Sequence, residues 1–184
     1  MLKRVFDIFF SLSGLFFLII PFAIIAILIK SEDGGPVFYR GERVGLGGKP
    51  FRIYKFRTMV IDAEKIGPAS TSDDDPRITK IGRFLRKYKL DELPQLINVL
   101  KGEMSFVGPR PQVPWAVKLY IEEEKKLLEV RPGITDYASI KFRNESEILK
   151  GSTDPDKDYL EKIAPGKLKL GLEYVNNMSI WTDL

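Results

Sequence analysis

Two adjacent carboxylates, Asp91 and Glu92, are the side chains in this 184-residue sequence whose types and spacing best suit chemistry. Carboxylates can transfer protons or ligate a hard cation. Pro94 follows two residues later, and because proline fits only the first turn of a helix, we expect the pair at a helix N-terminus. Plain helix capping is the competing interpretation, since aspartate commonly serves as a cap.

The sequence contains no cysteine and no histidine. This composition excludes disulfide frameworks, zinc sites built from Cys and His, thiol nucleophiles and mechanisms that use an imidazole base. Any chemistry must come from carboxylates, Lys, Arg, Tyr, hydroxyls or a cation held by oxygen ligands. The net charge of +4 favours anionic partners such as phosphates, acidic lipids or nucleic acid.

Arg110 lies between two prolines in the sequence Gly108-Pro109-Arg110-Pro111. The prolines restrict the backbone, so the guanidinium starts from a rigid base, which suits bidentate recognition of a phosphate. A stiff connector without a binding role is the alternative interpretation.

A strongly basic helix is predicted to start at Asp73-Asp74-Asp75-Pro76 and to end near Lys89. One face carries an apolar stripe at helical spacing, and the other faces carry basic residues without an acid. Contact with phosphate or membrane is favoured over a merely solvated face, because exposed helix faces often mix both signs of charge. The basic residues are Lys80, Arg83, Arg86, Lys87 and Lys89.

The element that most constrains the architecture is an uncharged stretch of 22 residues from Ile8 to Ile29. As a helix it would reach about 33 Å, enough to cross the hydrocarbon core of a bilayer. Pro21 should break this helix, because it cannot donate to the carbonyl of Phe17. Basic residues flank both ends, which indicates that both ends stay on the cytoplasmic side. From these residues alone, a re-entrant helix–break–helix and a kinked spanning helix are equally good predictions.

The remaining sequence predicts one β-hairpin followed mainly by helices. The hairpin arms are residues 36–39 and 51–56, with glycines between them for the turn. In the second arm, alternation should put Phe51, Ile53 and Lys55 on one face and Arg52, Tyr54 and Phe56 on the other. Helices are predicted over 113–130, from Asp154-Pro155, and at the end of the chain.

Eight short motifs, in order along nearly the whole chain, resemble those of the small monotopic phosphoglycosyl transferases. These are bacterial sugar transferases that initiate O-antigen, capsule and related glycan assembly. Each motif alone is weak, but together they are very specific. They are Lys3-Arg4-Val5-Phe6-Asp7, Tyr54-Lys55-Phe56-Arg57-Thr58-Met59, Gly82-Arg83-Phe84-Leu85-Arg86, Leu90-Asp91-Glu92-Leu93-Pro94-Gln95, Leu100-Lys101-Gly102-Glu103-Met104-Ser105, Gly108-Pro109-Arg110-Pro111, Arg131-Pro132-Gly133-Ile134-Thr135 and Arg143-Asn144.

The resemblance implies an α+β, mostly helical fold. Residues 1–33 would form a re-entrant membrane anchor broken at Pro21, and residues 34–184 a catalytic domain at the cytoplasmic face of the bacterial inner membrane. This domain would combine the β-hairpin with amphipathic helices that lie on the inner leaflet. The resemblance thus favours the re-entrant form over the spanning one.

The resemblance also implies a transferase reaction in two steps. Asp91 would attack the β-phosphorus of a UDP-sugar, releasing UMP and leaving a covalent aspartyl phosphosugar. Undecaprenyl phosphate would then accept the phosphosugar, with Mg²⁺ assisting. A carboxylate is a reasonable covalent nucleophile for this chemistry, and Mg²⁺ needs few protein ligands when phosphates supply the others.

The same resemblance assigns roles to individual residues. Asp91 would be the catalytic nucleophile and a magnesium ligand, and Glu92 its catalytic partner in metal binding or positioning. Basic side chains at matching positions would bind the substrate phosphates and offset charge on the transferring group. They are Arg86, Arg110, Arg143 and Lys55, the last with a structural role on the hairpin as its alternative.

Two departures from the family pattern bear on these expectations. Ile20 stands where the family often has a serine before the membrane proline, and that serine can repair the broken helix backbone. Residues 135–142 differ from the commoner Thr-Gly-Leu-Ala-Gln-Val-Asn-Gly, which predicts a different sugar preference if they line the sugar pocket.

A non-enzymatic membrane-anchored module that binds anionic lipid or a partner protein is the alternative function. The acidic pair Asp91-Glu92 argues against purely electrostatic lipid binding, because an anionic surface would repel it. Nucleic acid is not an expected partner, since no nucleic-acid-binding motif is present and a membrane segment is predicted.

Overall fold

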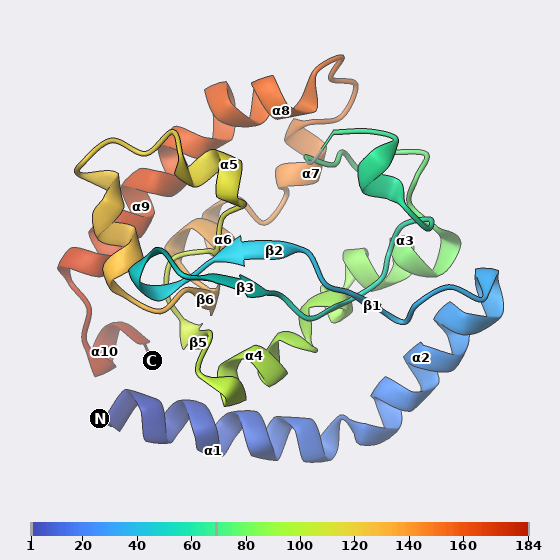
Figure 1. Ribbon diagram of the computed structural model, residues 1–184, viewed down its shortest axis with the longest axis horizontal. Coiled ribbons are helices and arrows are strands. Elements are labelled where there is room, and N and C mark those ends of the chain that lie inside the picture. The colour runs from blue at the N-terminus through green and yellow to red at the C-terminus, as the bar shows by residue number, and fades with distance from the viewer. Residues whose placement is uncertain (1, 69, 184) are drawn as a thin grey trace.

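The computed structural model describes residues 2–68 and 70–183 (Figure 1). Its first two helices, α1 (Leu2–Phe17) and α2 (Ile19–Asp33), run along one side of the molecule and meet at a bend of 61°. The bend falls at Leu18, three residues before Pro21, whose ring cannot supply the amide that would bond to Phe17. Among the described residues, neither helix has by itself the length and apolar character to cross a bilayer, but the bent pair together does.

The distribution of residues on α1 is the reverse of that on a soluble amphipathic helix. Its buried side chains are polar, Asp7 and Ser11, while Leu2, Phe9 and Phe17 are mostly exposed. Asp7 accepts hydrogen bonds from the hydroxyl of Ser105 and the amide of Phe106. Polar contacts therefore hold α1 to the rest of the protein, and its apolar side faces outward.

The predicted β-hairpin is confirmed, although its pairing is interrupted. Strand β1 (Phe38–Tyr39) pairs antiparallel with β4 (Lys55–Phe56), and β2 (Glu42–Val44) pairs antiparallel with β3 (Pro50–Arg52). Gly47 and Gly48 take positive φ in the turn, as the sequence predicted.

The predicted division of the second arm into two faces agrees with the packing of its apolar side chains. Phe51 and Ile53 belong to one core cluster, whereas Phe56 belongs to another, formed with residues of α2 and of the next α-helix. The rings of Tyr54 and Phe56 both contact the ring of Phe38, so these two side chains lie on the same side.

Helix α3 (Lys80–Lys87) starts later than the sequence predicted. Thr79 caps it by accepting from the amide of Gly82, while Asp75 instead accepts from the backbone and guanidinium of Arg77 in the preceding loop. Buried Arg77 therefore competes for the carboxylate that was expected to start the helix. Gly82 allows the close approach of α3 to the backbone of Thr58, because a Cβ would lie 2.0 Å from the Thr58 oxygen.

Asp91 and Glu92 lie in a 3₁₀ turn, Leu90–Glu92, directly before α4 (Gln95–Lys101). Gly102, at φ 83°, ends α4 as predicted. Helix α4 packs against α1, where Arg4 donates to the carbonyls of Val99 and Leu100.

The predicted helix over 113–130 is wrong. The chain forms only a short α5 (Pro114–Val117) and a later 3₁₀ segment, Glu124–Glu129. The Glu124 carboxylate accepts from the amide of Ile121, so the second segment has its own start, and the apolar side chains of Leu119 and Ile121 are exposed.

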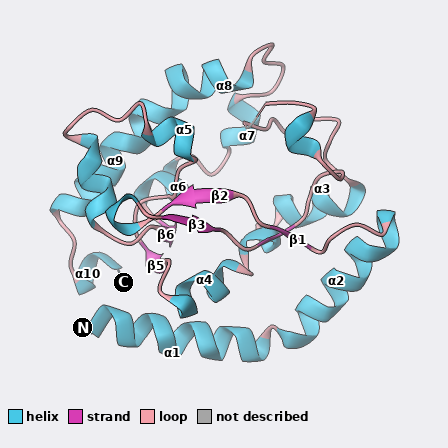
Figure 2. Ribbon diagram, in the orientation of Figure 1, coloured by secondary structure: helices cyan, strands magenta, loops and turns pink. Residues whose placement is uncertain are grey.

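Strand β5 (Ser105–Val107) pairs in parallel with β6 (Gly133–Thr135). Of the helices that follow β6, those within residues 145–176 lie on the side opposite α1 and α2, with the strands between them (Figure 2). The last helix instead returns to the start of α1, where Asp183 pairs with Lys3. Asp154 caps the helix that starts at Pro155, as predicted. These helices are α6 (Tyr137–Lys141), α7 (Glu145–Ile148), α8 (Pro155–Asp158), a π-turn Tyr159–Ile163, α9 (Ala164–Asn176) and α10 (Ile180–Asp183). A mostly helical α+β fold is thus confirmed in its coarse form.

Candidate active site

Glu92 lies at the centre of a buried ion-pair network that joins three of the predicted site residues. Its Oε1 lies 2.9 Å from Lys55 Nζ and 2.6 Å from Arg110 Nη2. Its Oε2 accepts from Arg110 Nη1 at 3.3 Å. The turn before α4, strand β4 and the segment after β5 therefore meet at one carboxylate.

Two neighbouring cations stabilise the ionised form of Glu92. Burial opposes ionisation, but the charges of Arg110 and Lys55 and their hydrogen bonds outweigh it, so the pKa of Glu92 lies well below its ordinary value. Lys55 is also buried, which lowers the pKa of its ammonium group, although Glu92 opposes this effect. Both oxygens of Glu92 are engaged by cationic side chains, so Glu92 positions Lys55 and Arg110 in this structure.

The pKa of Asp91 is shifted in the opposite direction from that of Glu92. Its side chain is only 8% exposed, and Oδ1 has no hydrogen-bond partner within residues 2–68 and 70–183. Burial raises the pKa of Asp91, with the positive charge of Lys55 opposing the shift and the negative charge of Glu92 adding to it. A buried carboxylate oxygen without a partner, next to fixed cations, can attack an electrophile or ligate a cation.

Arg86 approaches the site from α3. Its Nε donates to the Thr58 hydroxyl at 3.1 Å, and burial lowers its pKa, while the charges of Asp91 and Asp75 oppose the shift. The guanidinium of Arg86 therefore interacts electrostatically with the carboxylate of Asp91 and adds positive charge to the site.

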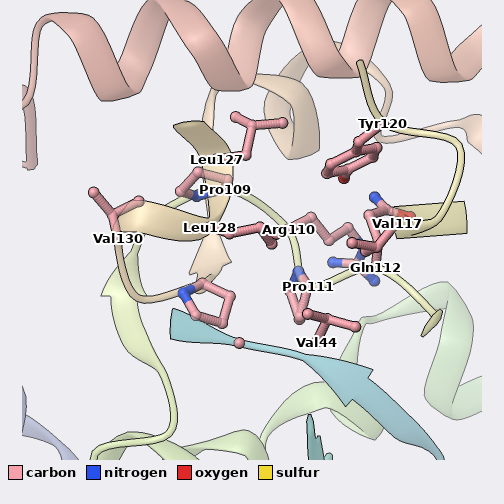
Figure 3. Close-up of a pocket in the computed structure, with 12 residues that line it drawn as sticks. Val44, Pro109, Arg110, Pro111, Gln112, Val117, Tyr120, Leu127, Leu128 and Val130 are labelled. Atoms are coloured by element: carbon pink, nitrogen blue, oxygen red, sulfur yellow. The ribbon is translucent and has the colours of Figure 1, made fainter. Parts of the chain in front are cut away.

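The backbone of Arg110 is fixed by more than its two prolines. Asp136, which caps α6, also accepts from the Arg110 amide at 3.2 Å. Figure 3 shows Arg110 between Pro109 and Pro111, with Tyr120 and Leu127 above and Val44 below. The cavity that these residues line measures about 20 Å³, room for one water but not for a sugar.

Arg143 is the predicted site residue that the structure does not bring to this network. It is exposed after α6, and no hydrogen bond or ion pair among the described residues links it to Asp91 or Glu92. Lys55, Arg86 and Arg110 are brought together with the acidic pair.

Three further residues at the site received no role from the sequence. Thr58 orients Arg86, Asp136 orients the backbone of Arg110, and Gln95 lies buried at the start of α4. The closeness of Gln95 to Asp91 in the sequence was a readable signal. The other two contacts join distant segments, so no local pattern could have revealed them.

Within the described part of the chain, no three acidic side chains gather to hold a metal ion. The donor set fits Mg²⁺ all the same, because this ion commonly takes one or two carboxylates and completes its shell with phosphate oxygens and water. Asp91, whose Oδ1 has no hydrogen-bond partner among the described residues, is the available ligand of this kind.

Comparison with known proteins agrees with this geometry. The family model for bacterial sugar transferases matches residues 1–184. Over 113 residues the chain is 55% identical to a Bacillus subtilis (strain 168) protein provisionally named undecaprenyl-phosphate N-acetylgalactosaminyl 1-phosphate transferase, an alignment that covers 61% of this chain and 63% of the relative.

Two other relatives match the full length of the chain. The sugar transferase EpsL of Bacillus subtilis (strain 168), itself uncharacterised, is 41% identical, with 82% of its length covered. The UDP-glucose:undecaprenyl-phosphate glucose-1-phosphate transferase of Escherichia coli (strain K12) is 38% identical, with 38% of its length covered. The chain therefore spans less than two thirds of the first and third of these relatives. It belongs to the bacterial sugar transferase family.

Proposed function

We propose that this protein transfers a sugar 1-phosphate from a UDP-sugar to undecaprenyl phosphate and releases UMP. The observation that carries the proposal is the buried carboxylate of Asp91 beside the Glu92–Arg110–Lys55 network, with one oxygen that has no hydrogen-bond partner in the described part of the chain. The names of the relatives support the same reaction class, since several denote transfer of a sugar phosphate to undecaprenyl phosphate.

The reaction proceeds in two displacements at one phosphorus. An Asp91 oxygen forms a bond to the β-phosphorus of the UDP-sugar, and the bond from that phosphorus to the bridging oxygen breaks, so UMP leaves with the electron pair. A phosphate oxygen of undecaprenyl phosphate then attacks the same phosphorus, and the bond to Asp91 breaks. The second step yields undecaprenyl diphosphate-sugar and restores the carboxylate.

The basic side chains of the site neutralise the phosphates during both steps. Arg110 and Lys55 are held in place by Glu92, and Arg86 is held by Thr58, so these groups need little rearrangement when charge develops. Arg143, on the exposed segment after α6, would bind a more distal phosphate or the departing nucleotide.

Mg²⁺ is the proposed cofactor, held by Asp91 and substrate phosphate oxygens, with Glu92 as the adjacent acid that keeps the surrounding cations in place. When bound, the ion supplies charge neutralisation on the diphosphate. Asp91 provides the bond to phosphorus, and Lys55 and Arg110 orient the phosphoryl oxygens.

The proposed location is the cytoplasmic face of the bacterial inner membrane, with residues 1–33 as a re-entrant anchor and residues 34–184 as the catalytic domain. Outward-facing apolar side chains on α1 and α2 support it, because exposed apolar surface of this extent is typical of a membrane contact. The 61° bend permits both helix ends to lie on one side of the bilayer. A lipid acceptor would then reach Asp91 from the surrounding leaflet.

The test is UMP release by the detergent-solubilised protein supplied with undecaprenyl phosphate, Mg²⁺ and a panel of UDP-sugars. We expect release that requires the lipid acceptor for turnover, stops in EDTA and is absent in Asp91→Ala. An active, folded Asp91→Ala protein would contradict the covalent mechanism. If no donor releases UMP while the protein still binds anionic vesicles, the non-enzymatic membrane-anchored module becomes the better account.

A further inference from the structure

Gln95 is a deeply buried amide at the active site with an unmet hydrogen-bond donor. Its side chain is 1% exposed, and Nε2 has no hydrogen-bond partner among the residues that the structure describes. Buried polar groups in proteins are nearly always paired, because an unmade hydrogen bond costs free energy. An unmet donor at this place points to a hydrogen bond that forms at another stage of the reaction.

Asn98, on the same helix α4, shows what a purely structural amide looks like here. It is fully buried, and its Oδ1 accepts from the amide of Tyr54 at 2.8 Å. Its Nδ2 donates to the carbonyl of Arg52 and to Glu103. Asn98 thus joins α4 to the hairpin through hydrogen bonds at both its Oδ1 and its Nδ2. The Nε2 of Gln95 makes no hydrogen bond to the described residues.

Hydrogen bonds of Glu92 and Asn98 to the hairpin show where Gln95 lies along it. Asn98 meets Arg52 and Tyr54, while Glu92 meets Lys55, so residues 92–98 run antiparallel to the hairpin strand. Gln95 is midway along this stretch. It begins α4 four residues after Asp91, which lies in the preceding 3₁₀ turn, so the two buried side chains come from consecutive turns of the chain.

The unmet groups on these two residues are complementary. Gln95 offers an N–H donor, and the buried Oδ1 of Asp91 is an acceptor that also lacks a partner among the described residues. A bond between the two groups would satisfy both at once. A carboxylate has about four acceptor positions, so such a bond leaves room for a cation on Asp91 as well.

We infer that Gln95 is a positioning residue, whose Nε2 donates a hydrogen bond to the carboxylate oxygen of Asp91 that does not attack phosphorus. The inference rests on the proposed function. When one oxygen bonds to the β-phosphorus, the other becomes the carbonyl oxygen of the acyl phosphate. A donor on that second oxygen fixes the orientation of the carboxylate during attack and during release.

The test uses Gln95→Met, which keeps the length of the side chain without a donor, and Gln95→Glu, which keeps its shape without a donor when ionised. In steady-state UMP release we expect kcat to fall by about tenfold to a hundredfold in both variants, because the reacting group is misoriented. KM for the UDP-sugar should stay within about twofold, because Gln95 acts on Asp91 and not on the bound donor. A single-turnover UMP burst without lipid acceptor should slow by the same factor.

Two controls separate positioning from a structural role. Gln112→Met makes the same chemical change at a glutamine whose amide oxygen accepts from Tyr159, and should leave the burst rate unchanged. Gln95→Met should not lower Tm, because no hydrogen bond of Nε2 is lost, whereas Asn98→Ala should lower it.

Unchanged kcat in Gln95→Met or Gln95→Glu, with the parent protein active, would overturn the inference. A fall in Tm of Gln95→Met with normal kcat in the folded fraction would also overturn it, in favour of a structural amide. A parent protein that releases no UMP from any donor would instead refute the proposed function, and this result is obtained before any variant is compared.

Discussion

Arg110 and Glu92 face each other in a two-contact ion pair, with Nη2 2.6 Å from Oε1 and Nη1 3.3 Å from Oε2. The pair joins the segment after β5 to the turn before α4, and Lys55 adds a third charge from the hairpin. Three separate motifs therefore converge on one carboxylate, next to Asp91. The predictions below follow from this arrangement and from a second buried ion pair outside it.

Replacing Arg110 by lysine should lower kcat/KM by about tenfold or more. Lysine keeps the charge but cannot make two parallel contacts to Glu92 and also present a planar group to phosphate. UMP-release kinetics across donor concentrations measure the effect. Arg52→Lys, at an exposed position of β3, is the matched control and should behave like the parent protein. Normal kinetics in Arg110→Lys would show that charge alone suffices at this position.

Asp91→Asn and Glu92→Gln should differ in their effects on stability. Burial raises the pKa of Asp91, which means that its charged form is unfavourable in the folded protein, so Asp91→Asn should abolish transfer without lowering Tm. Glu92→Gln removes the anion that compensates buried Lys55 and Arg110, so it should lower Tm. Thermal unfolding in one detergent and buffer compares them. The opposite ranking of Tm would contradict the electrostatic assignment.

Lys55→Met should move the acidic limb of the pH–rate profile to higher pH. Asp91 must be ionised to attack, so activity is lost as the pH falls through its pKa, which burial raises and Lys55 opposes. Removing the ammonium removes the lowering influence, and the pKa of Asp91 rises further. The profile of kcat/KM between about pH 5 and 8, at a fixed Mg²⁺ concentration, tests this because it reports groups of the free enzyme. Lys65→Met changes an exposed lysine paired with Asp62 and should leave the limb in place. A limb that stays or moves to lower pH in Lys55→Met would refute the prediction.

Asp75→Asn should destabilise the fold by about 3 kcal/mol at pH 7, since it breaks a buried pair with Arg77. The hydrogen bond from Arg77 lowers the pKa of Asp75, although burial opposes this shift. A depressed pKa gives stability that is present above the unfolded-state value and is lost as the pH falls through the folded-state value.

Denaturant unfolding at several pH values therefore tests the Asp75 prediction. The difference in free energy of unfolding between the parent protein and Asp75→Asn should be constant from pH 7 down to about pH 5 and shrink below about pH 4. Asp73→Asn, an exposed neighbour, should show no such dependence. A difference that grows towards acid would mean that the ion pair is not what stabilises this loop.

Local chemistry was enough to predict several features of this protein. The uncharged run 8–29 and Pro21 predicted a broken apolar helix, the glycines predicted the hairpin turn, and Gly102 predicted the end of α4. The ordered motifs predicted the family. Each of these features follows from backbone restriction, hydrophobic content or residue order, which need no knowledge of distant contacts.

Which side chains meet, and which of them form ion pairs, could be read only from the folded chain. Glu92, predicted as a metal partner of Asp91, has both oxygens engaged by Arg110 and Lys55, and Asp75 accepts from Arg77 instead of starting α3. Glu124, likewise, splits a stretch whose periodicity predicted one helix. Local propensity fixes which conformations are favourable, but burial and the competition of several donors for one carboxylate depend on segments far apart in the sequence.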